Sequence, residues 1–330
     1  MGPRVSVSLV VYNGEKYIRD CLLAVRAQTY RAMEVVVFDN NSTDRTRDIV
    51  RAEFPEFRLV TNDRNWGLGP GWNKCLTLTT GAYFVGLCAD VVIHPDFVHN
   101  GVAVMERDTG IGALQAKIYS VQEGIRTNII DTTGFIIFKS RRIVNRGHGE
   151  KDVGQYDQEG EVFSYEGAVP LWRRTAMEES AVNGECHDED FFWYADDIDF
   201  GWRMRLFGWK SWYAPNVIAY HDRSTTKRLS TGYRDFIRQR KTIPARKRML
   251  DWQNIHLTFL KNDFAVSILK HLPYILKREL ALLAYIIVFE PGTLRAVVRI
   301  LRLLPRMILK RRIIMRTKKA SRSDMERWFQ

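Results

Sequence analysis

The chain has 330 residues, of which 45% are hydrophobic and 27% charged, and it carries a formal net charge of +12. This composition excludes a chain that is disordered throughout, and the length allows one large α/β domain with an appendage. The cysteines have no CxxC spacing and follow no secretory leader, so we expect neither a disulfide framework nor a zinc site. They are Cys21, Cys75, Cys88 and Cys186. This cysteine usage favours a reducing, cytoplasmic environment.

Charge is distributed unevenly along the chain. Residues 1–221 contain 24 basic and 30 acidic residues, whereas residues 222–330 contain 26 basic and 8 acidic ones. We therefore predict a core domain over residues 1–221, in two halves that meet near residue 110, and a basic, mostly helical region over residues 222–330.

The basic region carries a helical apolar pattern. From Leu294 onward, Leu, Ile, Val and Met recur at intervals of three and four residues with Arg and Lys between them. The pattern predicts two amphipathic helices broken at Pro305, and our preferred interpretation is attachment to an anionic membrane surface. The alternative is a solvated helix packed on the core, and nucleic acid ranks third because no motif supports it. The longest uncharged apolar run, Leu280 to Phe289, falls well short of the ~20 residues of a spanning helix.

The first hundred residues alternate apolar strands with helical stretches, which predicts a parallel sheet. The expected strands are VSVSLVVYN, MEVVVFDNNSTD, FRLVTND and AYFVGLCAD, and the expected helices span about Glu15 to Gln28, end after Ile49 and begin near Trp72. Polar residues follow each strand and should gather at one edge of the sheet, where α/β proteins bind ligands. They are Asn13, Asp39, Asn40, Asn41, Asn62 and Asp90. From about Gly112 to Glu166 we expect loops and short strands that cover the sheet.

Two single carboxylates stand at predicted strand ends. Asp39 could accept the N3 proton of a pyrimidine, although the run from Asn40 to Asp44 could equally turn the chain and cap the next helix. Asp90 closes an apolar strand, where a divalent metal would satisfy its charge. His221 follows a later strand, and a lone histidine is more often structural than a ligand, so its role depends on Asp90.

In a third acidic group, three carboxylates lie within four residues. Asp196, Asp197 and Asp199 follow an aromatic block that would exclude water, and like charges so close raise one pKa. A raised pKa suits a general base, whereas an acidic helix N-terminus stabilised by the helix dipole would need the same residues.

Six segments in this order resemble a known family. They are VVYN, VVVFDNNSTD, NWGLGPGWN, LCAD, FFWYADDIDFGWR and the strand-terminal His221. The order resembles the family 2 inverting glycosyltransferases of GT-A fold over about residues 4–262, and is most similar to rhamnosyltransferase-like members of bacterial cell-wall and O-antigen polysaccharide pathways. The resemblance implies a Rossmann-like, mostly parallel central sheet flanked by helices, with a basic helical C-terminal extension. The half up to about residue 110 would bind the nucleotide-sugar, and residues 111–221 the acceptor.

The resemblance also implies roles for individual residues. The nucleotide-binding set is Tyr12, Asn13, Asp39, Asn41, Asn65, Gly67, Gly69 and Asn73. Asp90 and His221 would hold Mg²⁺ or Mn²⁺ on the donor diphosphate, and Asp197 would be the general base with Asp196 in support. The acceptor and sugar set is Glu166, Gly167, Ala168, Trp193, Tyr194 and Arg203. Two departures are Cys88 and Ala89 before Asp90, where relatives often carry another Asp or an Asn, and Asp196, where many carry Glu.

The predicted function is therefore metal-dependent, inverting hexosyl transfer to a hydroxyl of a glycan or lipid-linked saccharide. The resemblance favours dTDP-L-rhamnose as donor, with UDP-galactofuranose, UDP-glucose or UDP-GlcNAc as alternatives. It implies a peripheral protein on the inner face of the cell membrane, allows a homodimer and involves no nucleic acid. A nucleotidyltransferase is a second hypothesis, but we find no basic triphosphate loop near the amino terminus. A third is a carbohydrate- or membrane-binding scaffold that lost its chemistry, against which the DDID patch argues.

Overall fold

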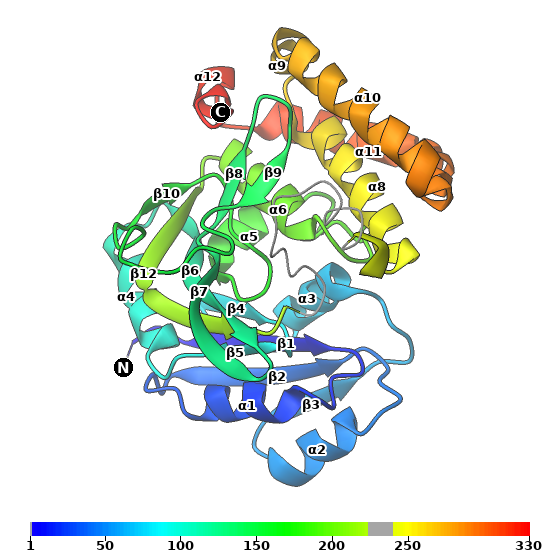
Figure 1. Cartoon of the computed structure of the whole chain (residues 1–330). Helices are drawn as coiled ribbons and strands as arrows, with labels where there is room; N and C mark the ends of the chain where they lie inside the picture. Colours follow the sequence, from blue (N-terminus) through cyan, green and yellow to red (C-terminus); the bar gives the residue numbers. More distant parts are fainter. Residues whose placement is uncertain (1, 224–239) are drawn as a thin grey trace.

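A computed structural model describes residues 2–223 and 240–330, and its centre is a ten-stranded mixed sheet with helices on both faces (Figure 1). The strand order is β10-β12-β6-β11-β4-β1-β2-β3, with β5 paired to β12 and β7 to β6. The predicted architecture, a mostly parallel central sheet flanked by helices with a helical C-terminal region, is confirmed.

The first half of the sheet is parallel, as the sequence predicts. Strands β1 (Val5–Val11), β2 (Met33–Asp39), β3 (Arg58–Thr61) and β4 (Tyr83–Leu87) are connected by helices α1 (Ile18–Arg26), α2 (Thr46–Glu53) and α3 (Leu68–Thr77). Every residue of β1 is buried, because it lies between β2 and β4 with helices above and below. The polar residues that follow these strands therefore meet at one edge.

The second half extends the sheet. It contains β5 (Val91–Ile93), α4 (Phe97–Arg107), β6 (Ile111–Gln122), β7 (Ile125–Thr132), β8 (Phe135–Ile137), β9 (Ile143–Asn145), β10 (Gly160–Val162), β11 (Leu171–Arg173), α5 (Arg174–Glu179), α6 (Asp196–Leu206) and β12 (Lys210–His221). Strands β6 and β12 are parallel, and β11 is antiparallel to both β4 and β6.

The prediction of loops and short strands from Gly112 to Glu166 is wrong for β6, a 12-residue strand in the middle of the sheet. Its first eight residues are buried on both faces, so the sequence lacks the alternation that marks a half-exposed strand. Its buried polar residues have partners: Gln115 accepts a hydrogen bond from the backbone N–H of Glu166, and Lys117 pairs with Asp152 at 2.9 Å.

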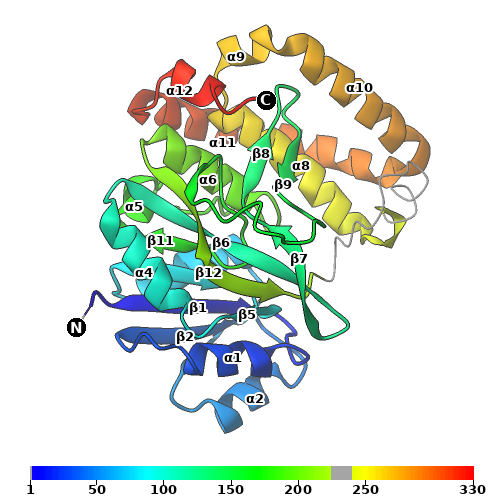
Figure 2. The same ribbon diagram turned by 60° about the vertical axis from the view of Figure 1, so that its left-hand side comes forward.

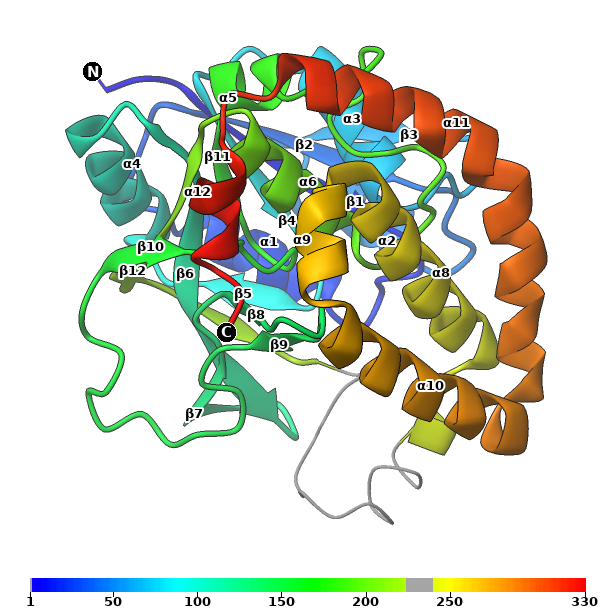
Figure 3. The same ribbon diagram turned by 90° about the horizontal axis from the view of Figure 1, so that it is seen from above.

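The C-terminal region consists of α8 (Ala245–Asn262), α9 (Ala265–Lys270), α10 (Leu272–Phe289), the 3₁₀ turn η1 (Pro291–Leu294), α11 (Arg295–Thr317) and α12 (Arg322–Glu326). Helix α8 packs between α6 and α11, while α10 lies at the periphery (Figures 2 and 3). Buried ion pairs join this region to the core, including Lys261 with Asp199 at 2.9 Å and Arg141 with Asp263 at 2.6 Å.

The predicted helix break at Pro305 is wrong, because α11 continues through it. Proline removes the N–H that would bond the carbonyl of Leu301, but Leu301 is 61% exposed and water can replace that donor. The chain bends instead near η1, where its direction changes by 119° between α10 and the helical segment Pro291–Thr317. Among the described residues, no single helix has the length and apolarity to span a membrane; only this bent pair meets both criteria jointly.

Candidate active site

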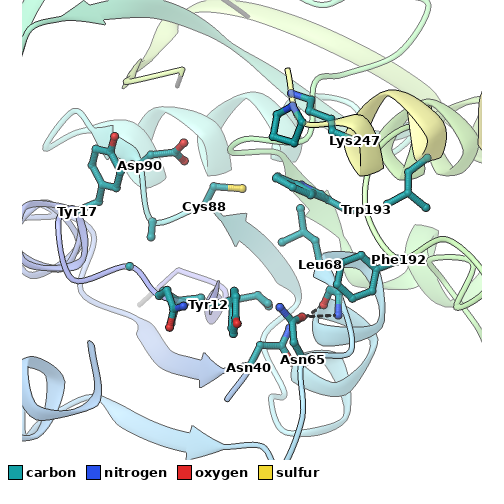
Figure 4. A pocket seen from close by; sticks show the side chains of 18 of the residues that line it. Tyr12, Tyr17, Asn40, Asn65, Leu68, Cys88, Asp90, Phe192, Trp193 and Lys247 are labelled. Carbon is teal, nitrogen blue, oxygen red and sulfur yellow. Dashed lines mark hydrogen bonds between the residues drawn. The ribbon is translucent and has the colours of Figure 1, made fainter. Parts of the chain in front are cut away.

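Two adjoining cavities lie at the carboxyl edge of the parallel strands. The first, of about 580 Å³, is lined by strand-end and loop residues that include Tyr12, Asn13, Asn40, Asn65 and Gly67 (Figure 4). The second, of about 360 Å³, is lined by residues that include Glu166, Gly167, Ala168, Asp196, Asp197 and His221. Both cavities share Leu68, Cys88, Asp90, Trp193 and Lys247. The fold thus places predicted nucleotide-binding residues in the first cavity and predicted catalytic and acceptor residues in the second. Asp90 lines both cavities.

The loops after β1 and β2 are tied together. Asn13 has a left-handed backbone (φ 50°), and its side-chain oxygen accepts a hydrogen bond from the Thr43 N–H at 2.8 Å. Its own N–H donates to the Ser42 hydroxyl at 2.9 Å. Tyr12, 51% exposed, stands at the rim of the first cavity. These contacts fix the edge on which a planar ligand could lie.

Asp39 and Asn41 lie under this rim rather than in its lining. Asp39 is fully buried and accepts hydrogen bonds from the Ser42 N–H at 3.1 Å and from Arg47 Nε at 2.5 Å. Asn41 has φ 70° and accepts a hydrogen bond from Arg47 at 3.1 Å. Arg47 therefore holds the whole strand-end loop in place.

The turn into α3 closes the first cavity from the other side. Gly67 has φ 98°, and a Cβ there would lie 2.0 Å from the carbonyl oxygen of Phe192, so only glycine fits. The side chain of Asn65 accepts a hydrogen bond from the Gly67 N–H at 2.9 Å, and Asn40 donates to the Gly67 carbonyl at 2.8 Å. The loop from β2 and the turn into α3 thus brace one another.

Gly69 and Asn73 lie further along α3 and do not line either cavity. A Cβ at Gly69 would lie 2.9 Å from Cβ of His187. Asn73 exchanges two hydrogen bonds with the backbone of His187, at 2.8 and 2.9 Å. Both residues anchor the segment before α6 to α3, so the structure gives them a supporting position.

Asp90 and His221 come together as the sequence predicts, with His221 Nε2 at 3.5 Å from Asp90 Oδ2. The other ring nitrogen, Nδ1, lies 3.0 Å from Asp131 Oδ2. Burial alone would lower the pKa of His221, but hydrogen bonds and charge from Asp131 and Asp90 outweigh it and raise this pKa to about 10. His221 is thus an imidazolium held between two carboxylates.

The chemistry of this pair fits a divalent metal. A carboxylate oxygen and an imidazole nitrogen are ordinary donors for Mn²⁺, and Asp131 braces the second nitrogen as outer-shell carboxylates brace metal-bound histidines. A metal would have to displace the proton on His221. Within residues 2–223 and 240–330, no three His, Cys, Asp or Glu side chains form a group that could hold a metal ion. Oxygens of a bound substrate and water are further ligands that such a metal ion accepts.

Asp197 stands at the first turn of α6 and faces the second cavity. Its Oδ2 accepts a hydrogen bond from the Gly167 N–H at 2.9 Å, and its Oδ1 from the Ile198 N–H at 2.8 Å. Burial, and then the charges of Asp196 and Glu166, raise the pKa of Asp197 well above its ordinary value.

Asp196 lies behind Asp197 and is buried. Burial, with charge from Asp199 and Glu166, raises its pKa to about 6. Its Oδ2 lies 3.9 Å from His187 Nδ1, but burial lowers the pKa of that histidine to about 3 and keeps it neutral. Because His187 is neutral, it does not offset the negative charge of Asp196. That charge therefore raises the pKa of Asp197.

Three of the predicted acceptor residues form one strip beside Asp197. Glu166 accepts hydrogen bonds from Arg223 at 2.9 Å and from the Ala168 N–H at 3.0 Å, and Gly167 donates to Asp197. Since both carboxylate oxygens of Glu166 have partners, its position in the wall of the cavity is fixed.

Of the aromatic residues, Trp193 and Tyr194 reach the second cavity. Their rings stack with centroids 4.2 Å apart, and the ammonium of Lys247 lies 4.2 Å from the Tyr194 ring. Arg203 is buried, bonds the Cys186 carbonyl and lies 4.0 Å from Asp199, so it lines neither cavity.

Sequence reasoning missed the contribution of the residues after 221. Lys247 on α8 lines both cavities, and burial lowers its pKa to about 8. Arg223 joins Asp131 to Glu166, and Asn254 donates to the carbonyls of Trp193 and Tyr194. No sequence signal separates Lys247 from its neighbours in the run ARKRM.

Two family models match segments of the chain. The model described as glycosyl transferase family 2 matches residues 6–155, and that of glycosyl transferase family group 2 matches residues 83–243. Each match covers just under half of the chain, which is therefore similar to glycosyl transferase family 2 over these segments. The predicted resemblance is confirmed, and both cavities lie mainly on the matched residues.

Curated relatives match about a third of this chain. An uncharacterized glycosyltransferase of Haemophilus influenzae is 28% identical over 125 residues, which cover 37% of this chain and 38% of the relative. Glycosyltransferase GlyA of Streptococcus pneumoniae is 31% identical over 115 residues, which cover 33% and 16%. The chain thus spans well under half the length of these relatives.

Solved structures share the fold. S. aureus TarS 1-349 in complex with UDP-GlcNAc is 17% identical with a TM-score of 0.55, covering 98% of this chain and 88% of that one. The mannosyltransferase PcManGT of Pyrobaculum calidifontis, in complex with GDP-Man and Mn²⁺, is 19% identical with a TM-score of 0.52, covering 91% and 74%. At these identities the likeness establishes the fold.

Proposed function

We propose that the protein transfers a sugar from a nucleoside diphosphate donor to an acceptor hydroxyl with inversion, and that Asp197 is the general base. The observation that carries the proposal is the placement of a carboxylate of raised pKa in a cavity that adjoins the strand-end cavity through Asp90. Similarity to glycosyl transferase family 2 supports the reaction class, and the two adjoining cavities support one site for the donor and one for the acceptor.

In this mechanism Asp197 takes the proton of the acceptor hydroxyl as its oxygen bonds the anomeric carbon. The bond from that carbon to the donor phosphate oxygen breaks, and its electron pair leaves with the nucleoside diphosphate. The Gly167 N–H orients the carboxylate of Asp197, which is held 2.9 Å away. Since one displacement occurs, the anomeric configuration inverts and no covalent enzyme intermediate forms.

Asp90 and His221 would hold a divalent cation at the donor diphosphate, where the cation supplies charge neutralisation for the leaving group. Mn²⁺ in the PcManGT structure supports the use of a divalent cation. Lys247, which reaches both cavities from α8, would add a positive charge beside the same phosphates.

The donor we favour is dTDP-L-rhamnose, with UDP-sugars such as UDP-galactofuranose, UDP-glucose or UDP-GlcNAc as the alternative. This preference rests on the sequence resemblance, because the placement predicted for Asp39 is not found: its carboxylate is fully buried against Arg47 and outside the lining of both cavities. A pyrimidine N3 proton would in any case not distinguish thymine from uracil. TarS binds UDP-GlcNAc and PcManGT binds GDP-Man, so related folds accept different bases.

Nucleotide binding tests the donor class. We expect dTDP or UDP, with Mn²⁺, to raise the thermal unfolding midpoint, since a ligand at ~100-fold over its Kd stabilises by about 2.7 kcal/mol. GDP, CDP and ADP serve as matched controls in the same scanning fluorimetry. A shift with GDP alone would replace the pyrimidine assignment, and no shift with any nucleotide would contradict a nucleotide-sugar site.

The environment of Asp197 makes a pH prediction. A general base must be deprotonated, so kcat/KM should rise as pH increases through the raised pKa of Asp197. Glu166→Gln removes one of the negative charges that raise this pKa, so the acid limb should move to lower pH. The position of the limb in a pH–rate profile is the measurement; an unchanged or upward-shifted limb would contradict the assignment of the base.

A further inference from the structure

Helix α10 leaves most of its apolar surface in water. Of its 18 residues, only Tyr285 and Ile286 are buried. Large apolar side chains between 36% and 67% exposed follow one another along it and continue onto the start of α11. We call these residues the outer face: Leu272, Tyr274, Leu276, Leu280, Leu283, Ile287, Val288, Phe289, Val297, Val298 and Leu301. A continuous apolar surface of this kind marks an interaction site.

The figures place the outer face at the periphery of the molecule. Helix α10 lies at the edge of the molecule, beyond α8 as seen from the central sheet (Figures 1 and 2), and Figure 3 shows α11 at the edge as well. Between α10 and the helical segment that contains η1 and α11, the chain changes direction by 119°. Two helices joined in this way present one bent apolar rim that no other described part of the chain covers.

Charge around the outer face is almost wholly positive. Residues 265–317 contain eleven Lys and Arg and only two carboxylates, Glu279 and Glu290. Glu290 is buried against Arg240 at 2.8 Å, and Glu279 pairs with the neighbouring Arg278. The carboxylates are therefore neutralised within the fold and leave the rim cationic.

Several cations beside the rim have no ion pair among the described residues. They are Lys277, Arg295, Arg299 and Arg302, all exposed. Apolar side chains interleaved with free cations are complementary to a surface that is both apolar and anionic. An anionic bilayer has this chemistry, since acyl chains receive the apolar groups and headgroups receive the cations.

We infer that the outer face docks on an anionic lipid bilayer, with α10 and the start of α11 lying in the headgroup region. A further step rests on the proposed function. Glu290, at the bend between α10 and α11, pairs with Arg240 and Arg248, which also line the cavity of Asp197. Docking there brings the acceptor cavity next to the bilayer, so the acceptor class is a saccharide carried by a membrane lipid.

Co-sedimentation of the full chain with vesicles tests the docking surface. The chain should bind vesicles of phosphatidylcholine mixed with phosphatidylglycerol and bind pure phosphatidylcholine more weakly. Leu280→Asp with Ile287→Asp places two charges on the rim, and affinity should fall by more than about tenfold. Arg299→Gln should weaken binding about fivefold, since one surface cation is lost.

The matched control carries Ile125→Asp with Val153→Asp, two apolar residues that are 69% and 78% exposed outside the outer face. It should bind vesicles like the wild type, and nucleotide-induced thermal shifts should confirm that all variants fold. Docking is overturned if the wild type binds neither vesicle, or if the rim variant binds unchanged. Docking is also overturned if the wild type binds no vesicles but forms a dimer and the rim variant does not, because the outer face then binds a second copy of the chain.

The docking surface and the proposed function fail separately. Vesicle binding without any nucleotide response would contradict the transferase proposal and leave the docking surface standing. Turnover of a soluble acceptor without vesicle binding would contradict the docking surface and leave the transferase proposal standing. To test the acceptor class, transfer to a lipid-linked saccharide in phosphatidylglycerol vesicles is compared with transfer to the free saccharide. The class is supported if the lipid-linked rate is higher by more than about tenfold and the variant Leu280→Asp with Ile287→Asp loses this difference. Equal rates for the two acceptors overturn it.

Discussion

Asp197→Asn should lower kcat by about a thousandfold, since a positioned general base contributes ~10²–10⁴ to rate. The amide keeps the shape of the side chain but cannot take the acceptor proton. Donor affinity should change little, because Asp197 lines the second cavity and not the first. Steady-state turnover of the donor and a separate nucleotide titration measure the two effects.

An exposed aspartate provides the control for that variant. Asp48 on α2 is exposed and takes no part in either cavity, so Asp48→Asn removes the same charge and should leave kcat unchanged. If Asp197→Asn retained wild-type turnover, Asp197 would not be the base. If no donor were turned over even by the wild type while nucleotides still bound, the scaffold hypothesis would replace the enzyme.

The parallel half of the fold could be predicted because its signals are local. Each of β1, β2 and β4 is an apolar run that ends in polar residues, and a parallel sheet brings those ends to one edge. That topological rule is sufficient to gather Asn13, Asn40 and Asp90, and the spacing of the segments indicates the family. The convergence of Asp90 with His221 follows from the pairing of β5 with β12.

The second half is less predictable because burial there hides the pattern. Both faces of β6 are covered, and its polar residues, such as Gln115, bond to partners far along the chain. Its sequence therefore shows no alternation of apolar and polar residues that would predict a strand. Pro305 misleads for the opposite reason: its exposed position lets solvent replace the lost hydrogen bond, and the helix continues.

The contribution of α8 to the site could not be found from the sequence at all. Its residues act on groups about sixty positions away, and a contact at that separation leaves no periodic trace. Lys261 is fully buried and pairs with Asp188 and with Asp199, at 2.9 Å from the latter. The region that composition marks as a basic appendage therefore supports the helix that carries Asp197.

Asn254 on α8 contacts the backbone directly before the helix that carries Asp197. Tyr194 and Ala195, directly before α6, both have left-handed backbones, with φ 71° and 58°. Each such non-glycine residue costs of order 1–3 kcal/mol and persists only where the surroundings enforce it. Asn254, fully buried, donates to the carbonyls of Trp193 and Tyr194, each at 2.9 Å. It thus holds the strained turn that aims Asp197 into the cavity.

Asn254→Ala should therefore lower kcat about 10- to 100-fold through misplacement of Asp197, and reduce the free energy of unfolding by about 1–3 kcal/mol. Donor affinity should stay near the wild-type value, and this split between kcat and binding separates positioning from general damage. Asn100→Ala is the matched control, because it removes an amide that donates to the Asn216 carbonyl at 2.8 Å, outside both cavities. That control should lose stability and keep its kcat; equal losses of kcat in both variants would show that Asn254 contributes only to stability.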